Sequence, residues 1–236
     1  MLGGILFVLC TGIPWGVPAA GAGVRLRDDV MAAAAGLAPG RGLAAAARGA
    51  AGRPECRRGA GLVQGGDRQL ARPRAEGRPK TGPSPVDRAR TGSKHHVITE
   101  GHGIPLAVTL TGGQRHDVTQ LMPVLAAIPP VRGRRGRPRQ RPDRVYADRG
   151  YDHDTYRRQV RQKGITPVIA RRGTEHGSGL GAHRWVVEQS LALLHWFRRL
   201  RIRWEIRDDI HEAFLGLACA IICWRRLRHL SPGQDL

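Results

Sequence analysis

The chain has 236 residues and carries 39 Lys and Arg against 19 Asp and Glu, a formal net charge of +20. This length provides for one domain or two small ones, and this charge favours a polyanionic partner, nucleic acid before a membrane surface. The four cysteines lack the spacing of a disulfide scaffold or a zinc ribbon. The apolar run at residues 2–10 is too short to span a bilayer and lacks a basic segment before it. We therefore expect reduced thiols, a cytoplasmic protein without membrane association, and a short buried helix at residues 2–10.

Residues 16–78 differ in composition from the rest of the chain. Of these 63 residues, 45 are Ala, Gly, Arg or Pro, and none is aromatic, Ile, Lys, Ser, Thr or His. So few large apolar side chains cannot bury enough surface to offset the entropy lost on ordering the chain. We expect this low-complexity segment to be poorly ordered and to have no core.

From residue 79 onward the sequence predicts strands first and alternating elements later. Residues 94–99 and 104–111 flank a glycine-containing turn, which is typical of a β-hairpin. An apolar-periodic helix follows over residues 117–128, with Asp117 as its N-cap. This order favours a mixed α/β domain over residues 79–236.

The second half of this domain is predicted as two short strands and three helices. An apolar strand at residues 145–147 precedes a helix at 156–163 that a glycine ends, and a strand covers 165–170. A long amphipathic helix is expected from about residue 184 to 199, and a buried helix from about 208 to 227.

Two carboxylates are candidate catalytic residues. Asp148 follows an apolar strand and lies just before a glycine, so it is well placed to reach an open site. Glu188 lies among apolar helical residues, where an uncompensated charge is costly to bury, and Arg184 one turn earlier can pair with it. From spacing alone the alternative remains that Asp148 shapes a turn and Glu188 forms half of a surface ion pair.

The segments around these carboxylates resemble the DDE-type transposases of bacterial insertion sequences. Residues 145–152 read Val-Tyr-Ala-Asp-Arg-Gly-Tyr-Asp, similar to the motif that carries the family's second catalytic Asp. The pattern Arg184-x3-Glu188-x6-His195 is similar to the signature of the third acidic residue, with His195 in place of a Lys. Further segments match the family in the expected order: 2–15, 82–88, 92–96 and 165–172.

The resemblance implies a ribonuclease-H-like fold, with a mixed sheet and flanking helices, and metal-dependent cleavage and strand transfer on double-stranded DNA. The DNA partners would be transposon ends and target, with a homodimer left open and a nucleoid-associated location in the cytoplasm. In such enzymes two Asp and one Glu hold two Mg²⁺ or Mn²⁺ ions, which activate the nucleophile and steady the leaving oxygen. Asp148 and Glu188 are thus implied as catalytic metal ligands, and Arg184 and His195 as contacts to DNA.

The family's first catalytic Asp should precede Gly82 by about a dozen residues. Residues 66–77 stand there without a strand pattern, and nothing in the sequence supports Asp67 or Asp87 as a substitute. Their back-translation, read one nucleotide later, can give Val-Ile-Asp-Ser-Ser-His-Val-Arg-Ala-Leu-Lys, which resembles the missing segment. We hypothesise that residues 16–78 are translated out of frame between two compensating frameshifts. Residues 1–15 would then be a remnant of an N-terminal helical segment, and the 79–236 domain would be impaired by the loss of its first catalytic strand.

Two basic runs are candidate DNA contacts. Residues 129–144 hold seven arginines interleaved with Gly and Pro, which can neutralise phosphates with salt-sensitive affinity, although a solvated loop without groove specificity is the alternative. Residues 197–203 would continue the Glu188 helix along DNA. The candidates from the two runs are Arg132, Arg134, Arg135, Arg137, Arg139, Arg198 and Arg199.

Other interpretations remain open at this point. The histidines at 95, 96, 102 and 116 follow no metal-binding frame, so we expect scattered surface histidines. A non-catalytic, basic DNA-binding remnant of a transposase is the main alternative function, and metal-dependent nicking of DNA separates it from an enzyme. A basic RNA-associated protein is a third, but the chain lacks the aromatic stacking platforms that such modules often use.

Overall fold

The computed structural model describes residue 9 and residues 60–71, 79–85, 88–131, 138–173 and 181–229; of these, 60–71, 181–185, 187 and 227–229 are described by their backbone alone. The described strands are β1 (Ala60–Ala71), β2 (Gly82–Pro83), β3 (Thr91–Thr99), β4 (Pro105–Gly112), β5 (Arg144–Ala147), β6 (Thr166–Ile169) and β7 (Ile202–Arg203). The helices are α4 (Leu121–Ala126), α5 (Asp154–Gln162), α6 (Gly181–His195), α7 (Arg198–Arg201) and α8 (Asp208–His229), and the short 3-10 helices are η3 (Asp117–Gln120) and η4 (Arg149–Tyr151).

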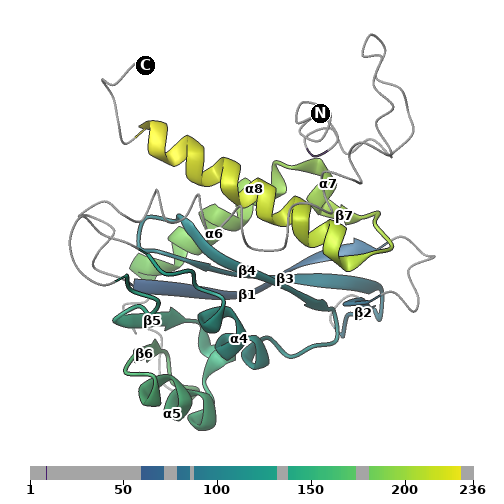
Figure 1. Ribbon diagram of the computed structural model, residues 1–236. Coiled ribbons are helices and arrows are strands. Elements are labelled where there is room, and N and C mark those ends of the chain that lie inside the picture. Colours follow the sequence, from purple (N-terminus) through teal and green to yellow (C-terminus); the bar gives the residue numbers. More distant parts are fainter. Residues whose placement is uncertain are drawn as a thin grey trace, which may run out of the picture.

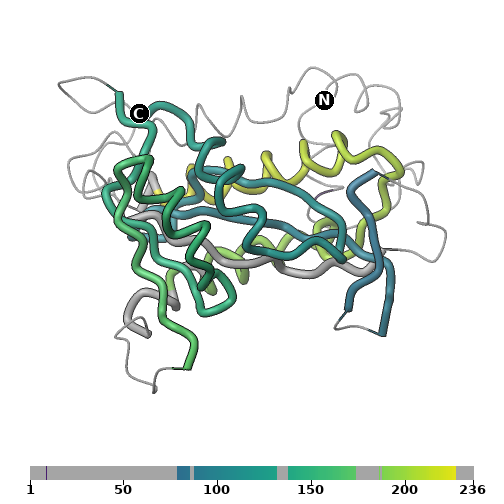
Figure 2. The backbone as a smooth tube through the Cα atoms, turned by 90° about the horizontal axis from the view of Figure 1, so that it is seen from below, coloured from purple at the N-terminus to yellow at the C-terminus, as the bar shows by residue number. Residues whose placement is uncertain are grey.

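The strands form one mixed sheet in the order β2-β3-β1-β5-β6, with β4 paired to β3 and β7 paired to β1. β1 lies at the centre, antiparallel to β3 and parallel to β5 and β7. Helices α6, α7 and α8 cover one face and α4 and α5 lie toward the other (Figure 1). Seen from below, α8 runs along the direction of the hairpin strands (Figure 2). The mixed α/β class predicted from the sequence is confirmed, and the arrangement is consistent with a ribonuclease-H-like fold.

The central strand β1 is the largest difference from the sequence-based expectation. Residues 66–77 carry no strand pattern, yet residues 60–71 pair with β3 on one side and with β5 on the other. Neighbouring strands supply the hydrogen bonds that hold such a glycine-rich segment extended, so local propensity does not decide its structure. The expectation that the segment before residue 79 lacks a strand is therefore wrong for residues 60–71, while residues 16–59 and 72–78 lie outside the described residues.

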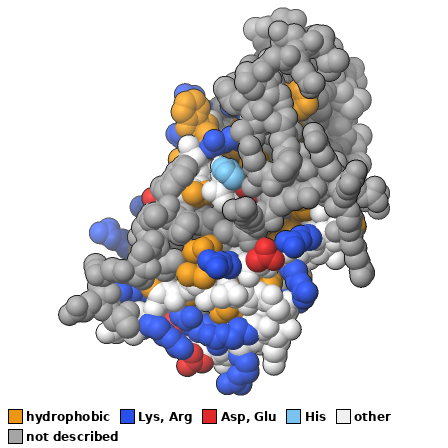
Figure 3. All heavy atoms as spheres, turned by 90° about the vertical axis from the view of Figure 1, so that its left-hand side faces the viewer, with side chains coloured by type: hydrophobic (Ala, Val, Ile, Leu, Met, Phe, Trp, Pro, Cys, Tyr) orange, Lys and Arg blue, Asp and Glu red, His pale blue; other side chains and the backbone are white. Residues whose placement is uncertain are grey.

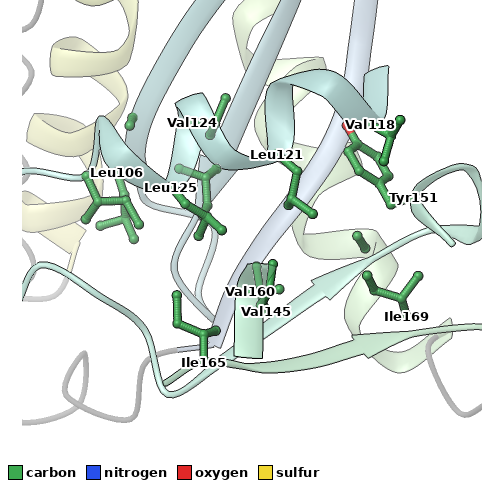
Figure 4. Close-up of a cluster of buried hydrophobic side chains, with 14 residues drawn as sticks. Leu106, Val118, Leu121, Val124, Leu125, Val145, Tyr151, Val160, Ile165 and Ile169 are labelled. Atoms are coloured by element: carbon green, nitrogen blue, oxygen red, sulfur yellow. The ribbon is translucent and has the colours of Figure 1, made fainter. Parts of the chain in front are cut away.

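Alternate side chains of β3 enter two separate cores, as the two-residue period of a strand requires. Val97 joins the core beneath α6, α7 and α8, which also contains Leu194, Phe214 and Leu215. Ile98 joins the core formed with α4, α5, β5 and β6, part of which is shown in Figure 4. Each fully buried aliphatic side chain of these cores contributes about 1.5–3 kcal/mol relative to an exposed one.

The predicted hairpin is confirmed, and its turn explains the glycine in it. β3 and β4 pair antiparallel, and the Gly103 N–H donates to the carbonyl oxygen of Glu100. Gly103 has a φ of 82°, which a residue without a side chain adopts at no steric cost. The Glu100 carboxylate also accepts from the backbone N–H groups of His102 and Ile104, so the acid closes the turn.

Two helix predictions need correction. The helix expected over residues 117–128 begins as the 3-10 turn η3, with His116 rather than Asp117 at its N-cap, because the Asp117 carboxylate accepts instead from Lys94 Nζ at 2.9 Å. The helix expected over residues 184–199 ends at His195, and α7 starts separately after an extended Phe197. The basic run at residues 197–203 therefore does not continue the Glu188 helix.

The remaining elements follow the predictions closely. The strands near residues 145–147 and 165–170 are β5 and β6, and the final helix is α8. Helix α5 ends before Gly164, which has a φ of 70°. Leu9 is helical and fully buried in the core with α8, while the rest of the helix expected at residues 2–10 lies outside the described residues. In the described part of the chain, no helix is long and apolar enough to cross a membrane.

Candidate active site

Asp148 follows the last residue of β5 and caps the short helix η4. Its Oδ1 accepts from the backbone N–H of Gly150 at 2.9 Å, and its side chain is exposed. A Cβ at Gly150 would lie 2.9 Å from the same oxygen, so the glycine gives the carboxylate room to turn back over η4. Strand, cap and glycine together hold one exposed carboxylate at the end of a central parallel strand.

Buried and exposed polar contacts fix the loop that follows Asp148. Asp152 accepts from Arg157 Nε at 2.7 Å through Oδ1 and from the backbone N–H of Arg172 at 2.7 Å through Oδ2. Burial alone would raise the pKa of Asp152, but these hydrogen bonds and the charges of Arg157 and Arg171 hold it below its usual value. Arg157 in turn donates to the carbonyl oxygen of Ile169 in β6. The Asp148 loop is thereby tied to α5 and β6.

Glu188 lies on α6, which packs against the strand that carries Asp148. Tyr146 of β5 packs against buried Val186 of α6, and Tyr146 and Asp148 point to the same side of the strand because they are two residues apart. On α6, the Ser190 hydroxyl donates to the carbonyl oxygen of Gly103 at 2.9 Å, which anchors the helix to the hairpin turn. Glu188 is exposed, about 200° around the helix from Val186.

The structure therefore places the two elements that carry the candidate carboxylates side by side, but it does not form a complete metal site from them. Within the described residues, no three His, Cys, Asp or Glu side chains are grouped so that they could hold a metal ion. Arg184, the proposed partner of Glu188, lies in α6, but its side chain is outside the described part of the structure.

The register of β1 shows which residue stands beside Asp148 where the family has its first Asp. Val63 pairs with Ala147, so Gln64 is level with Asp148 at the next step along the two strands. Asp67 lies three residues further along β1, roughly 10 Å away along the strand, and pairs with His95 of β3. Asp87 lies outside the described residues. By register, the position next to Asp148 holds a neutral residue.

The predicted DNA contacts fall into three groups. Arg198 is exposed, His195 is half-buried in the last turn of α6, and Arg139 is exposed and paired with Asp143 at 3.2 Å. Arg132, Arg134, Arg135 and Arg137 lie outside the described residues. Arg199 is the third case, because its side chain is inside the protein.

Arg199 is 1% exposed, and its Nε donates to Glu205 Oε1 at 2.6 Å. Its guanidinium also lies 5.5 Å from the centre of the Trp204 ring. The expectation that Arg199 faces DNA does not hold in this structure, because its charge is buried and paired. The break between α6 and α7 turns this position inward.

A buried polar cluster surrounds Glu205, and the sequence did not reveal it. His211 of α8 donates from Nδ1 to Glu205 Oε2 at 3.1 Å, and its Nε2 lies 3.1 Å from Nε2 of His95 in β3. Since the carboxylate can only accept, His211 Nδ1 is the donor to Glu205, and of the two Nε2 atoms one donates and the other accepts. Arg203 donates to the Glu205 carbonyl oxygen, and also to Ser93 Oγ at 2.9 Å. These residues, with Arg199, connect β3, α7, β7 and α8.

Burial and neighbouring charges shift the pKa values of two residues in this cluster. The pKa of His95 is lowered well below its usual value by burial first, and then by the charges of His211, His96, His195 and Arg203. Burial alone would raise the pKa of Glu205, but the hydrogen bonds and charges of His211 and Arg199 hold it below its usual value. The one signal in the sequence is Glu205 itself, a single acid in a run of basic and apolar residues.

The prediction of scattered surface histidines is wrong for His95 and His96, which are both buried in β3. His96 binds Thr111 Oγ1 through Nε2 at 2.7 Å, and burial lowers its pKa to about 4. His102 and His116 are exposed, as expected. Strand alternation sends His95 and His96 into opposite faces of the sheet.

Comparison with known families identifies the class of protein. A family model described as the transposase DDE domain matches residues 67–223, from within β1 to within α8. The chain therefore belongs to the DDE transposases, and the matched range contains both Asp148 and Glu188.

Two relatives extend this finding to insertion sequences. The chain is 57% identical over 206 residues, 87% of this chain and 97% of the relative, to a putative transposase for insertion sequence element IS402 from Burkholderia cepacia. It is 27% identical over 116 residues, 45% of this chain and 36% of the relative, to the transposase for insertion sequence element IS1106 from Neisseria meningitidis serogroup B. Because the first match covers 87% of the chain, it extends over much of residues 16–78.

Proposed function

We propose that this transposase cleaves double-stranded DNA at transposon ends and transfers the strands to a target, using Mg²⁺ or Mn²⁺ held by Asp148 and Glu188. The observation that carries the proposal is an exposed carboxylate at the end of β5, beside the helix that carries a second one, inside the range matched by the DDE domain. The same family membership supports double-stranded DNA as partner. The net charge of +20 supports a location on the nucleoid.

The chemistry of the two side chains fits a hard divalent cation. Asp148 uses Oδ1 to cap η4, and no partner of its Oδ2 is recorded among the described residues, so this oxygen can bind an ion. Carboxylate oxygens are the ligands that Mg²⁺ and Mn²⁺ prefer. Such ions, when bound, would activate the attacking hydroxyl and stabilise the leaving oxygen at the phosphodiester. The protein's part is to hold the two carboxylates on rigid elements, at the end of β5 and on α6.

We further propose that the activity of this chain is impaired. Two-metal sites hold their ions about 3.5–4 Å apart, which requires a carboxylate shared between them. The position beside Asp148 in β1 belongs to Gln64, and a glutamine offers only a neutral carbonyl oxygen. Asp67 lies too far along the strand, by register, to take this place.

The frameshift hypothesis for residues 16–78 remains part of this proposal. Its support is the excess of Ala, Gly, Arg and Pro and the family-like peptide in the next reading frame. Three observations oppose it: β1 pairs at the centre of the sheet, the family match begins at residue 67, and the 57% identical relative aligns over much of residues 16–78. The nucleotide sequence across codons 15 to 79 is the test, and one uninterrupted frame with no shift would exclude it.

A second function, a non-catalytic DNA-binding remnant of a transposase, is favoured by one observation. The described residues contain no group of three metal-binding side chains, whereas both the basic charge and the family membership persist. Such a protein would occupy transposon ends without cutting them.

Nicking of a supercoiled plasmid that carries the insertion-sequence ends separates the two functions. The full chain is incubated with Mg²⁺, Mn²⁺ or a chelator, beside D148N, E188Q and the control D154N, which changes an exposed aspartate on α5. The proposed enzyme gives slow, metal-dependent nicking that D148N and E188Q abolish and D154N retains. Salt-sensitive binding without nicking under any condition would instead establish the DNA-binding remnant.

A further inference from the structure

Arg172, which the DNA-contact candidates do not include, lies against the loop that carries Asp148. Its Nε donates to the carbonyl oxygen of Arg149 at 3.3 Å, and its NH2 donates to that of Gly150 at 3.4 Å. Gly150 is the same residue whose N–H binds the Asp148 carboxylate. Gly150 is therefore bound by both side chains: its N–H by the Asp148 carboxylate and its carbonyl oxygen by the Arg172 guanidinium.

The charge of Arg172 is not matched by a carboxylate among the described residues. The nearby Asp152 accepts from the backbone N–H of Arg172, and its other oxygen accepts from Arg157. The preceding residue, Arg171, differs because it forms an ion pair with Asp154 at 2.6 Å. Within the described residues, long contacts hold the guanidinium of Arg172: the two carbonyl oxygens and, at 3.4 Å, His153 Nε2; the side chain is exposed.

The surface around Arg172 is basic as well. Lys and Arg side chains gather on the face of the molecule shown in Figure 3, in the lower part where α5, β5 and β6 lie. On these elements and the adjoining turns, exposed basic residues outnumber exposed acidic ones; they include Arg144, Arg158, Arg161 and Lys163. This surface attracts a polyanion to the end of the sheet at which Asp148 lies.

We propose that Arg172 binds a backbone phosphate of the DNA strand next to the phosphodiester that Asp148 serves. This inference rests on the proposed function, since it assigns the DNA position beside that site. A guanidinium presents several N–H donors in a planar fork, so two donors can hold the η4 carbonyls while others face a phosphate oxygen. Phosphate contacts fix the position of the duplex and carry no sequence information. Arg172 is thus a positioning residue that aligns the strand with the Asp148 loop.

The competing role is a purely structural brace of η4, and two substitutions distinguish it from phosphate binding. Arg172→Gln keeps an amide donor for the Gly150 carbonyl but removes the charge. Arg172→Lys keeps the charge but loses the fork. The control is Arg90→Gln, which removes an exposed charge from the turn between β2 and β3, outside the basic surface of α5, β5 and β6.

The experiment measures the affinity of the full chain for a duplex of a transposon end against salt concentration, in a chelator and without cleavage. Each phosphate contact contributes about 0.9 to the slope of log affinity against log salt. We expect Arg172→Gln to lower the slope by about 0.9, while Arg172→Lys retains it and Arg90→Gln leaves it unchanged. Thermal unfolding of each variant checks that the fold is intact.

An unchanged slope in Arg172→Gln overturns the inference, as does a loss in Arg172→Lys as large as that in Arg172→Gln, because both results describe a brace rather than a charge contact. If the unsubstituted chain shows no salt-dependent binding to DNA, the inference also fails. Nicking in Mg²⁺ or Mn²⁺ is a separate measurement, so metal-dependent cleavage with an unchanged slope would leave the proposed function intact and reject Arg172 alone.

Discussion

Two polar regions of this transposase differ in how their charges are matched. The buried polar cluster of His95, Arg199, Arg203, Glu205 and His211 lies between the sheet and α8, and its members bind one another. The exposed rim at the end of β5 carries Asp148 and Arg172.

The difference separates side chains that support the fold from those that can bind a ligand. Charged groups in a low-dielectric interior require partners. The acid and the arginines of the cluster therefore bind groups of the protein itself and hold four elements together. Asp148 instead uses one oxygen to cap η4. The Arg172 guanidinium contacts two carbonyl oxygens and the His153 ring, and has no carboxylate partner among the described residues. Substitutions in the cluster should therefore change stability, and those in the rim should change metal and DNA binding.

Glu205→Gln should have the largest effect on stability. The substitution removes the negative charge that Arg199 and His211 share, at a place where the arginine side chain is only 1% exposed. Breaking a buried ion pair from one side costs about 3–5 kcal/mol. Urea denaturation at pH 7 measures this change in the free energy of unfolding.

Glu212→Gln is the matched control, because Glu212 also belongs to α8 but pairs with Lys80 nearer the surface, where both side chains are partly exposed. Its loss should cost less than about 1 kcal/mol. Equal losses in the two variants would contradict the contrast between the cluster and the surface.

The second prediction concerns the acid sensitivity of β3, which holds two buried histidines. Burial lowers the pKa of His96 to about 4 and that of His95 well below its usual value. Below pH 6.5 the unfolded chain takes up protons that the folded chain does not, so stability is complete above pH 6.5 and falls as the pH drops toward 4. His96 alone should lower the free energy of unfolding by roughly 2 kcal/mol between pH 7 and pH 5.

His96→Gln should remove that part of the pH dependence, and the same substitution at the exposed His116 should keep it. The pKa values of Glu205 and Asp152 are below their usual ones, so these carboxyls titrate at lower pH and contribute little between pH 7 and pH 5. A pH profile that stays as steep in His96→Gln as in the unsubstituted chain would refute the assignment.

Particular residues show which parts of the fold can be predicted from the sequence. The hairpin, the strand before Asp148 and the stop at Gly164 were predicted because each depends on neighbours in sequence. The burial of His95 depends on His211, 116 residues away, and no local pattern contains that contact. Such pairings between distant segments also explain why β1 was missed.

The candidate site shows the same limit. Asp148 could be located from a strand end and a motif, because both are local features. Arg199 was misplaced because an amphipathic pattern continues across Phe197, where the backbone turns out of the helix. Arg172 ends a segment that matches the family, but no local pattern reveals its contacts, which are two carbonyl oxygens and a histidine ring about 20 residues earlier in the chain.

Gly150→Ala should lower the free energy of unfolding less than the substitutions above, and it tests the exposed rim directly. The new Cβ would lie 2.9 Å from Asp148 Oδ1, so the carboxylate must move away from its cap position. We expect a loss of about 0.5–1 kcal/mol in stability, typical of a weakened cap, together with weaker binding of Mn²⁺. Gly101→Ala is the control, because no atom lies within 4 Å of the added Cβ there. Binding of Mn²⁺ that is unchanged in Gly150→Ala would show that the orientation of this carboxylate is not important.

Asp148→Asn should change stability least and function most. Asparagine caps a helix about as well as aspartate and can accept the same Gly150 N–H, so the free energy of unfolding should change by less than about 0.5 kcal/mol. The charge that attracts a divalent cation is lost, however, and the rise in melting temperature that Mn²⁺ gives the unsubstituted chain should disappear. If Mn²⁺ still stabilises Asp148→Asn to the same extent, the cation binds elsewhere. The exposed rim would then bind no metal ion, and its difference from the buried polar cluster would not concern ligand binding.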